Sequence, residues 1–575
     1  MSSVVTATAT TSDSHAHASV GPIRRLLVLF ASDRGDIVLV IVFSIAVGIL
    51  MLATPVTVQA LVNFVSFGGL LQPLVVLGIL LFGFLALAGA IRTIQAYVIE
   101  ILQRRLFVRV VADLADRLPR VTAECYDRQN GPELVNRFFD VVTVQKVAAM
   151  LLLDGATVLL QAFVGLLVLA FYHPFLLAFD VVLVLSIGFV VFVLGRGAIR
   201  TSIQESRAKY AVAAALEELA RYPLVFKLAG AADFARRRAD ALAVHYVQTR
   251  SSHFSVVLRQ TIGFTTLQVI AATALLSIGG GLVLEGQLTL GQLVAAELIV
   301  TSILATFSKL GKQLENVYDL LAAVDKLGHL MDLPLERADG MAEQSRTDAP
   351  GLRIIGASFA FEEQKPVFTN FNLDVGPSDR ICVVGRHGSG KSVLADLLFG
   401  LRRPTKGRIE LNGFDVRELS LKILREHVAL VRDVETIEGT VEDNVRMGRE
   451  GVTAEDIRDA LNEVGLLDEI RALPDGLLTL LTSTGKPLSS GQTKRLMVAR
   501  AMVGRPKVLI LDDVLDDLDP DARDSVLAAV VRPERKWAVI ILGRHDFTSL
   551  GVERVVFLDK ANPPSVQGQL AGSPG

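Results

Sequence analysis

Residues 380–392 read RICVVGRHGSGKS, and this stretch decides the fold of the C-terminal part of the 575-residue chain. Its apolar start predicts a buried strand, and VLADLL at 393–398 predicts a helix after the glycines. Glycines between a strand and a helix let backbone N–H groups turn toward phosphates, and the helix N-terminus adds positive potential. We therefore expect a phosphate-binding loop, formed by Gly385, Arg386, His387, Gly388, Ser389, Gly390, Lys391 and Ser392.

The last two residues of this loop and a second strand suggest a reaction. Lys391 is expected to reach the β- and γ-phosphates of a nucleotide, and the Ser392 hydroxyl to hold Mg²⁺. The run VLILDD at 508–513 predicts another buried strand, which ends in two carboxylates. Asp512 fits a Mg²⁺ ligand, and Asp513 is placed to orient or deprotonate the water that attacks the γ-phosphate. The alternative for this pair is two solvated acids at a strand end.

The motif LSSGQ at 488–492 lies between these two elements. With it, residues 23–560 resemble the ATP-binding-cassette exporters, specifically half-transporters that fuse one membrane domain to one nucleotide-binding domain. The resemblance implies that two cassettes face each other head to tail, with each ATP between the phosphate loop of one and the signature motif of the other. It assigns further nucleotide contacts to Ser489, Gly491 and Gln492 in the signature, to Phe361 on the adenine, and to Asp519 in the loop that links the two ATP sites. A core position in a strand is the alternative for Phe361.

Four positions depart from the family pattern. Arg432 stands where the family has a glutamine that contacts Mg²⁺ and the attacking water, and a guanidinium cannot ligate a metal. Asp513 replaces the general-base glutamate and reaches about 1 Å less far. Strand alignment puts Arg544 at the switch histidine, although His545 follows directly and a one-residue slip would restore it. Ser490 replaces a glycine, which is mild unless the backbone φ there is positive. The pattern supports ATP binding more directly than fast hydrolysis.

The N-terminal part is far more apolar than a soluble enzyme. Residues 37–91 contain no Asp, Glu, Lys or Arg, and 155–195 contain only Asp180. A third charge-poor block, 260–308, contains only Glu285 and Glu297. A membrane helix needs about 20 apolar residues, so each block is long enough for two helices. We expect six membrane helices, near 37–65, 73–98, 147–171, 175–196, 260–284 and 288–309.

The placement of Lys and Arg predicts the orientation in the membrane. The three tight turns inside the apolar blocks carry neither residue, whereas the connections 92–153 and 196–259 carry nine and eleven Lys or Arg residues. By the positive-inside rule, the N-terminus, both connections and the nucleotide-binding domain are cytoplasmic, in a multi-pass protein of the plasma (inner) membrane. Helical spacing in the two connections predicts that the membrane helices continue into the cytoplasm, with breaks near 119–130 and 216–223.

The expected fold is multidomain: an all-α six-helix transmembrane domain of the type I ABC exporter fold, followed by an α/β P-loop nucleotide-binding domain. A net charge of −2 indicates no nucleic-acid partner. The expected boundaries are a disordered segment 1–21, the membrane domain with its cytoplasmic helical extensions 22–332, a linker 333–351, the nucleotide-binding domain 352–560 and a disordered tail 561–575.

The function predicted from the resemblance is that of a dimeric ATPase that exports a peptide, protein or hydrophobic substrate across the lipid bilayer. The membrane part is somewhat similar to peptide and type I secretion exporters, which allows a periplasmic adaptor protein as a partner. The altered catalytic positions leave two arrangements open, a homodimer with slow turnover or the degenerate half of a heterodimer. A third hypothesis is an ATP-gated membrane regulator that transports nothing.

Overall fold

The computed structural model describes residues 21–66, 71–128, 131–341, 351–361, 365–547, 551–558 and 566–567. The chain forms two compact units that divide between Pro334 and Leu335. Almost all of the segment 1–21 and most of the tail 561–575, both expected to be disordered, lie outside the described residues. The strand β12 (Val566–Gln567) is an exception to the expected tail, since it pairs with β11 (Arg554–Phe557).

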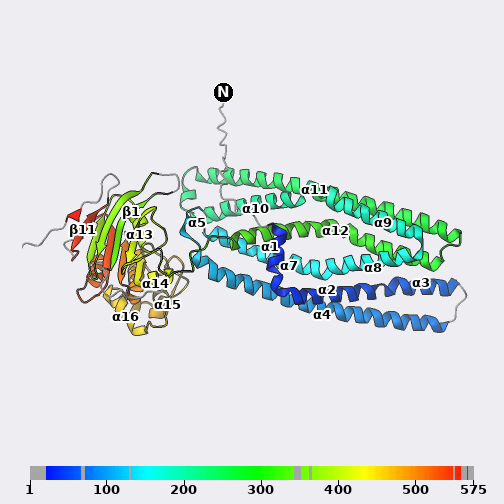
Figure 1. Cartoon of the computed structure of the whole chain (residues 1–575), viewed down its shortest axis with the longest axis horizontal. Helices are drawn as coiled ribbons and strands as arrows, with labels where there is room; N and C mark the ends of the chain where they lie inside the picture. The colour runs from blue at the N-terminus through cyan, green and yellow to red at the C-terminus, as the bar shows by residue number, and fades with distance from the viewer. Residues whose placement is uncertain are drawn as a thin grey trace, which may run out of the picture. The chain divides into compact units, whose positions relative to one another are not determined.

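The N-terminal unit is helical, and its long helices run alongside one another (Figure 1). Its α-helices are α1 (Pro22–Leu29), α2 (Arg34–Met51), α3 (Ala53–Ser66), α4 (Leu71–Arg117), α5 (Ala123–Arg128), α6 (Gly131–Asn136), α7 (Asp140–Met150), α8 (Ala156–Tyr172), α9 (Pro174–Gly188), α10 (Ala198–Arg221), α11 (Ala231–Leu284) and α12 (Leu290–Met331). Shorter helical turns are η1 (Ala31–Asp33), η2 (Leu118–Arg120), η3 (Arg137–Phe139), η4 (Leu151–Gly155), η5 (Phe189–Leu194) and η6 (Val225–Lys227).

Several helices of this unit are long enough to span a membrane. Among the described residues, five helical stretches are long and apolar enough to cross a membrane: Ala31–Ser66, Gln72–Arg120, Arg137–Tyr172, Pro174–Leu194 and Ala231–Leu284. The sixth expected span, 288–309, falls in α12, whose first residues Leu290–Ile303 are apolar. The 54 residues of α11 extend about 80 Å at 1.5 Å per residue, well beyond the hydrocarbon thickness of a bilayer.

Apolar side chains and small residues pack these helices together. Leu169, Leu183 and Leu275 are buried in one cluster that joins α8, α9, α11 and α12. Close approach occurs where α12 meets α3, because the backbone N–H of Gly291 donates to Asn63 Oδ1 at 3.1 Å. A Cβ at Gly291 would lie 2.3 Å from that oxygen, so only glycine fits without a shift.

The two breaks in the cytoplasmic connections lie near their expected positions, with one difference. η2 and α5 form the first break, at 118–128, which overlaps the predicted 119–130. The second was predicted at 216–223, but α10 continues to Arg221, because the alanine-rich sequence before it favours helix. Pro223 disfavours helix in the residue before it, and Gly230, at φ +80°, precedes α11. The break therefore lies at 222–230.

The C-terminal unit combines a six-stranded sheet and a four-stranded antiparallel sheet. In the larger sheet the order is β12-β11-β3-β10-β9-β6, and every neighbouring pair except β12–β11 is parallel. The smaller sheet has the order β2-β1-β4-β5. Strands not yet given are β1 (Leu352–Phe359), β2 (Phe368–Val375), β3 (Arg380–Val384), β4 (Lys406–Leu411), β5 (Phe414–Asp415), β6 (Val428–Val431), β7 (Gly439–Thr440), β8 (Leu480–Leu481), β9 (Val508–Asp512) and β10 (Ala538–Gly543).

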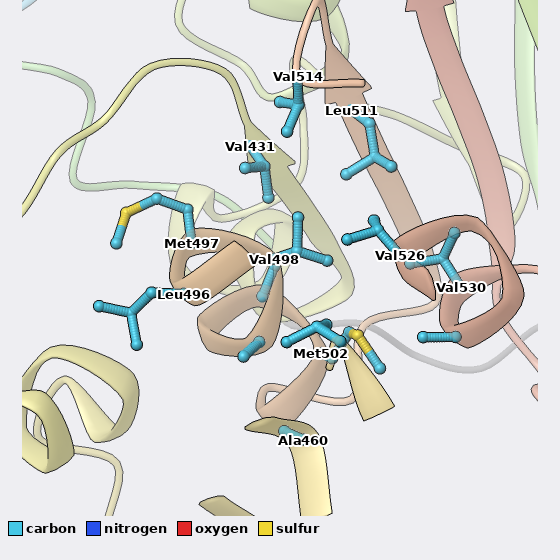
Figure 2. Close-up of a cluster of buried hydrophobic side chains, with 14 of the residues drawn as sticks. Val431, Ala460, Leu496, Met497, Val498, Met502, Leu511, Val514, Val526 and Val530 are labelled. Atoms are coloured by element: carbon cyan, nitrogen blue, oxygen red, sulfur yellow. The ribbon is translucent and has the colours of Figure 1, made fainter. Parts of the chain in front are cut away.

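Both faces of the six-stranded sheet are covered. Successive side chains of a strand point to opposite faces. Accordingly, Leu509 and Leu511 join the core under α18 and α19, while Val508 and Ile510 join the core under α13. Figure 2 shows Val498, Val526 and Val530 gathered around Leu511. The helices are α13 (Lys391–Leu398), α14 (Leu421–His427), α15 (Val441–Arg446), α16 (Ala454–Glu463), α17 (Leu467–Arg471), α18 (Ser490–Val503) and α19 (Pro520–Val530), with the turn η7 (Gly476–Leu478).

Candidate nucleotide-binding site

The expected phosphate loop joins the end of β3 to the start of α13, as the sequence predicts. Gly388 and Gly390 have φ of +76° and +102°, a region that favours glycine. A Cβ at Gly390 would also lie 2.6 Å from Val367, and one at Gly385 would lie 2.4 Å from Ser389 Oγ. The glycines are therefore needed for the shape of the loop. Arg386 and His387 are exposed on the loop.

Lys391 lies inside this loop with its side chain buried. Its Nζ donates to the carbonyl oxygens of Gly385, at 2.9 Å, and Arg386, at 3.5 Å. The same Nζ is 4.0 Å from Oδ1 of Asp513. Ser389 is buried as well, and its hydroxyl has no hydrogen-bond partner in the described part of the chain. One cation and one unsatisfied polar group thus face the centre of the loop.

Asp512 ends β9 beside the loop and is almost completely buried. Burial raises the pKa of Asp512, whereas the guanidinium of Arg432 and a hydrogen bond from the Ser392 side chain act in the opposite direction. Oδ2 accepts from Arg432 Nε at 2.6 Å. Oδ1 is buried without a hydrogen-bond partner among the residues described here. The Ser392 hydroxyl and Asp512 Oδ1 are two adjacent oxygen donors of the kind that Mg²⁺ prefers.

Asp513 takes an unusual backbone conformation directly after β9. Its φ is +54°, a left-handed value that Asp and Asn adopt more readily than other non-glycine residues. Its N–H donates to the carbonyl of Leu542 on β10 at 2.9 Å, which fixes the turn. The side chain is 37% exposed and faces Lys391. The carboxylate is thus held beside the loop yet open to water.

Arg432 follows β6 and contacts three acceptors at once. Nε donates to Asp512, Nη2 donates to the carbonyl of Ser392 at 2.7 Å, and Nη1 forms an ion pair with Asp396 Oδ1 at 2.8 Å. Asp396 also receives Arg402 Nε at 2.8 Å. Burial lowers the pKa of Arg432 but the two carboxylates raise it above its usual range, so the residue is a permanent cation. Sequence reasoning missed Asp396 and Arg402. An acidic residue within the apolar run VLADLL was the one feature of the sequence that pointed to Asp396.

The signature residues form the N-terminus of α18. The Ser489 hydroxyl accepts from the Gln492 N–H at 3.2 Å, and Gln492 Oε1 accepts from the Ser489 N–H at 2.6 Å. Gln492 also hydrogen-bonds Glu469. Gly491 lies in the first turn of the helix, and Ser490 is its first residue with a helical backbone, so the Ser490 substitution causes no strain. This capping box leaves the N-terminus of α18 open to a negatively charged group.

The remaining predicted residues have contacts of their own. The Phe361 ring packs edge-on against Phe359, with centroids 5.1 Å apart, and lies 5.2 Å from the guanidinium of Arg402, so it is partly buried against the core. Asp519 caps α19 by accepting from Ala522 N–H at 3.0 Å.

The two candidates for the switch position are exposed after β10. The N–H of Arg544 donates to Asp516 at 2.9 Å, and the carbonyl of His545 accepts from the thiol of Cys382 at 3.4 Å. The structure thus brings together five of the predicted residues: Lys391, Ser392, Arg432, Asp512 and Asp513. The hydrogen bonds described above for Ser489 and Gln492 lie within the N-terminal turn of α18 and reach only the neighbouring helix α17.

Two family models match the chain. The model described as "ABC transporter" matches residues 368–516, and the one described as "ABC transporter transmembrane region" matches 37–307. The chain is therefore an ATP-binding-cassette exporter half-transporter, a membrane protein whose ATPase activity is coupled to transport.

Relatives and a solved structure agree with this family. An ATP-dependent lipid A-core flippase of Thiobacillus denitrificans is 28% identical to this chain, over 84% of both chains. A second one, of Francisella novicida, is 25% identical to this chain, over 84% of this chain and 83% of the relative. A structure of a bacterial Atm1-family ABC exporter with ATP bound is similar with a TM-score of 0.80 and 20% identity. It covers 92% of this chain and 94% of its own. The predicted type I exporter fold, a helical membrane domain followed by an α/β nucleotide-binding domain, is confirmed.

Proposed function

We propose that this half-transporter uses ATP to move a lipid-linked, amphipathic molecule outward across the plasma (inner) membrane, as a dimer with cytoplasmic nucleotide-binding domains. One observation carries the proposal: a phosphate loop with two adjacent carboxylates follows long apolar helices in the same chain. The names of the relatives, which are similar over most of the chain, support a lipid-linked cargo. They favour a lipid-linked cargo over the peptide or protein cargo that the sequence suggested first, and they do not support a role in type I secretion in particular.

The proposed hydrolysis uses the residues gathered at the loop. Lys391 binds the phosphates, and Asp513 accepts the proton of a water that attacks the γ-phosphate, so that ADP and inorganic phosphate are released. Ser392 and the free Oδ1 of Asp512 are the donors that fit Mg²⁺, which when bound screens the charge of the phosphates. Phe361 contacts the adenine, and the signature Ser489, Gly491 and Gln492 of a second chain complete the site.

Transport follows from closing and opening that shared site. ATP joins the two nucleotide-binding domains, because its γ-phosphate contacts the phosphate loop of one chain and the signature motif of the other. Hydrolysis removes this shared contact and releases the domains. The switch from inward- to outward-facing helices then depends on the differential affinity of ATP for the closed dimer.

The test is ATP turnover by the purified protein in vesicles of defined composition. We expect phosphate release to rise when vesicles of neutral phospholipid also contain a lipid A-type glycolipid, and to vanish in Lys391→Ala. A fluorescent glycolipid should move to the opposite leaflet only in the presence of ATP. Stimulation by a hydrophobic peptide and none by the glycolipid would assign the cargo to the peptide class instead.

A second candidate is the degenerate half of a heterodimer, and the ion pair between Arg432 and Asp512 favours it. In that case a competent partner performs the turnover. Hydrolysis that begins only when a second half-transporter is added would establish this arrangement. ATP binding without turnover, with or without such a partner, would favour the regulator that transports nothing.

A further inference from the structure

Arg432 bridges the two carboxylates on the metal side of the candidate site. Its three nitrogens reach Asp512, Asp396 and the carbonyl of Ser392, all between 2.6 and 2.8 Å. Two of these three residues are also expected to bind the metal: Asp512 through its carboxylate and Ser392 through its side-chain hydroxyl. The guanidinium is therefore fixed directly beside the two oxygen donors for Mg²⁺.

The charges of the buried cluster balance because of this residue. Lys391, Arg432 and Arg402 supply three positive charges, against three negative charges on Asp396, Asp512 and Asp513. With a neutral glutamine at 432, as the family pattern has, Asp512 would lose its ion-pair partner and its negative charge would be uncompensated. A divalent cation would then be needed to balance both that carboxylate and the phosphates.

We propose that Arg432 is a built-in cation that takes over part of the role of Mg²⁺, so that nucleotide binding by this chain is largely independent of the metal. This inference rests on the proposed nucleotide site. Oδ1 of Asp512 stays available to a metal, but one oxygen of the carboxylate is already neutralised, which weakens its attraction for a second cation. The guanidinium is rigid and always charged, so neither pH nor metal supply changes it in the physiological range.

The ion pairs of Arg432 also allow its proposed role toward the metal to be distinguished from a purely structural one. Asp396 has a second partner in Arg402, so removal of Arg432 leaves Asp396 paired. Asp512, in contrast, loses its guanidinium partner. The variant Arg432→Gln should therefore create a demand for a cation at Asp512 specifically, and Mg²⁺ can meet it.

The test compares the affinity for a fluorescent ATP analogue in Mg²⁺ and in EDTA, with the full-length protein in detergent. We expect the wild type to lose less than about tenfold in affinity when Mg²⁺ is removed, and Arg432→Gln to lose at least about tenfold more than the wild type does. Arg402→Gln is the matched control, because it removes the other partner of Asp396 and leaves Asp512 paired. Its ratio of the two affinities should equal that of the wild type.

A second measurement needs no nucleotide. Mg²⁺ should raise the melting temperature of nucleotide-free Arg432→Gln and leave that of the wild type unchanged. If the wild type binds the analogue but depends on Mg²⁺ as strongly as Arg432→Gln, the inference is wrong while the nucleotide site stands. If the wild type binds no analogue in either buffer, the proposed function itself fails. The wild-type comparison decides the question even if Arg432→Gln does not fold.

Discussion

Asp513, the proposed general base, lies in a turn whose backbone conformation limits which residues fit there. Its left-handed φ of +54° suits Asp or Asn, and the hydrogen bond to Leu542 holds the turn in place. A longer Glu would regain reach toward the γ-phosphate but fits this backbone conformation less well. The shorter carboxylate of Asp513 thus matches the local geometry.

The first prediction concerns this carboxylate. Asp513→Asn should reduce ATP turnover at least about 100-fold, because the proton acceptor is lost while the backbone conformation is kept. Binding of a fluorescent ATP analogue should stay within about threefold of the wild type. Phosphate release and equilibrium binding measure the two quantities. Asp475→Asn, at an exposed acid of the same unit, is the control, and normal turnover in Asp513→Asn would remove the residue from the reaction.

The second prediction separates the two switch candidates. His545→Ala should lower turnover more than Arg544→Ala, because the compact imidazole can donate a hydrogen bond to the γ-phosphate without adding a long, flexible side chain. Both side chains are exposed, so neither substitution should change the melting temperature by more than a degree or two. A larger loss in Arg544→Ala would assign the switch role to the arginine.

At the scale of elements, α18 carries both a stabilising cap and the expected signature contact. Ser489 and Gln492 satisfy each other's backbone N–H groups, as in a capping box. The helix N-terminus also attracts a negative charge from outside. These two roles can be separated by substitutions that differ in charge but not in capping ability.

The third prediction uses that difference. Ser489→Ala should lower the free energy of unfolding by about 1 kcal/mol through loss of the cap. Ser489→Asp should keep the cap and the stability, yet abolish turnover, because its carboxylate repels the γ-phosphate of a nucleotide bound by the partner. Chemical unfolding and phosphate release check the two effects. Full turnover in Ser489→Asp would exclude a phosphate at this position.

The fourth prediction concerns the packing of the membrane helices. Gly291→Ala should destabilise the protein by about 1–3 kcal/mol, because the added methyl group overlaps Asn63 where α12 meets α3. Gly83→Ala, in α4, is the control, since nothing lies within 4 Å of a Cβ there. Thermal unfolding in detergent measures the difference, and equal melting temperatures would mean that α3 and α12 separate at little cost.

For the whole molecule, the question is whether each ATP site is formed by residues of two chains. The family architecture shows a half-transporter, and the proposed dimer places the base of one chain opposite the signature of the other. A site assembled in this way predicts a specific pattern of complementation between inactive variants.

The fifth prediction follows from that pattern. Asp513→Asn and Ser489→Asp should each be inactive alone, but a mixture of equal amounts should recover about a quarter of wild-type turnover. Half of the dimers are then mixed, and each mixed dimer has one site with an intact base and an intact signature. Mixed and unmixed samples are compared by phosphate release after subunit exchange. No recovery, in a mixture shown to exchange subunits, would argue against a shared site.

The order of the parts and most of the expected site can be predicted from short stretches of the amino-acid sequence. The phosphate loop, the strand ending in Asp512 and Asp513, and the apolar helices are local patterns, because backbone geometry and hydrophobic spacing act over a few neighbouring residues. The fold class followed from the same patterns.

The contacts between distant side chains could not be predicted in this way. Arg432 was visible as a departure, but its partners Asp396 and Asp512 are 36 and 80 residues away, and no local rule connects them. The pairing of β12 with β11 and the left-handed turn at Asp513 likewise depend on neighbouring strands. Long-range ion pairs and strand pairings form only when distant segments pack together, so their identity belongs to the folded chain rather than to any single segment.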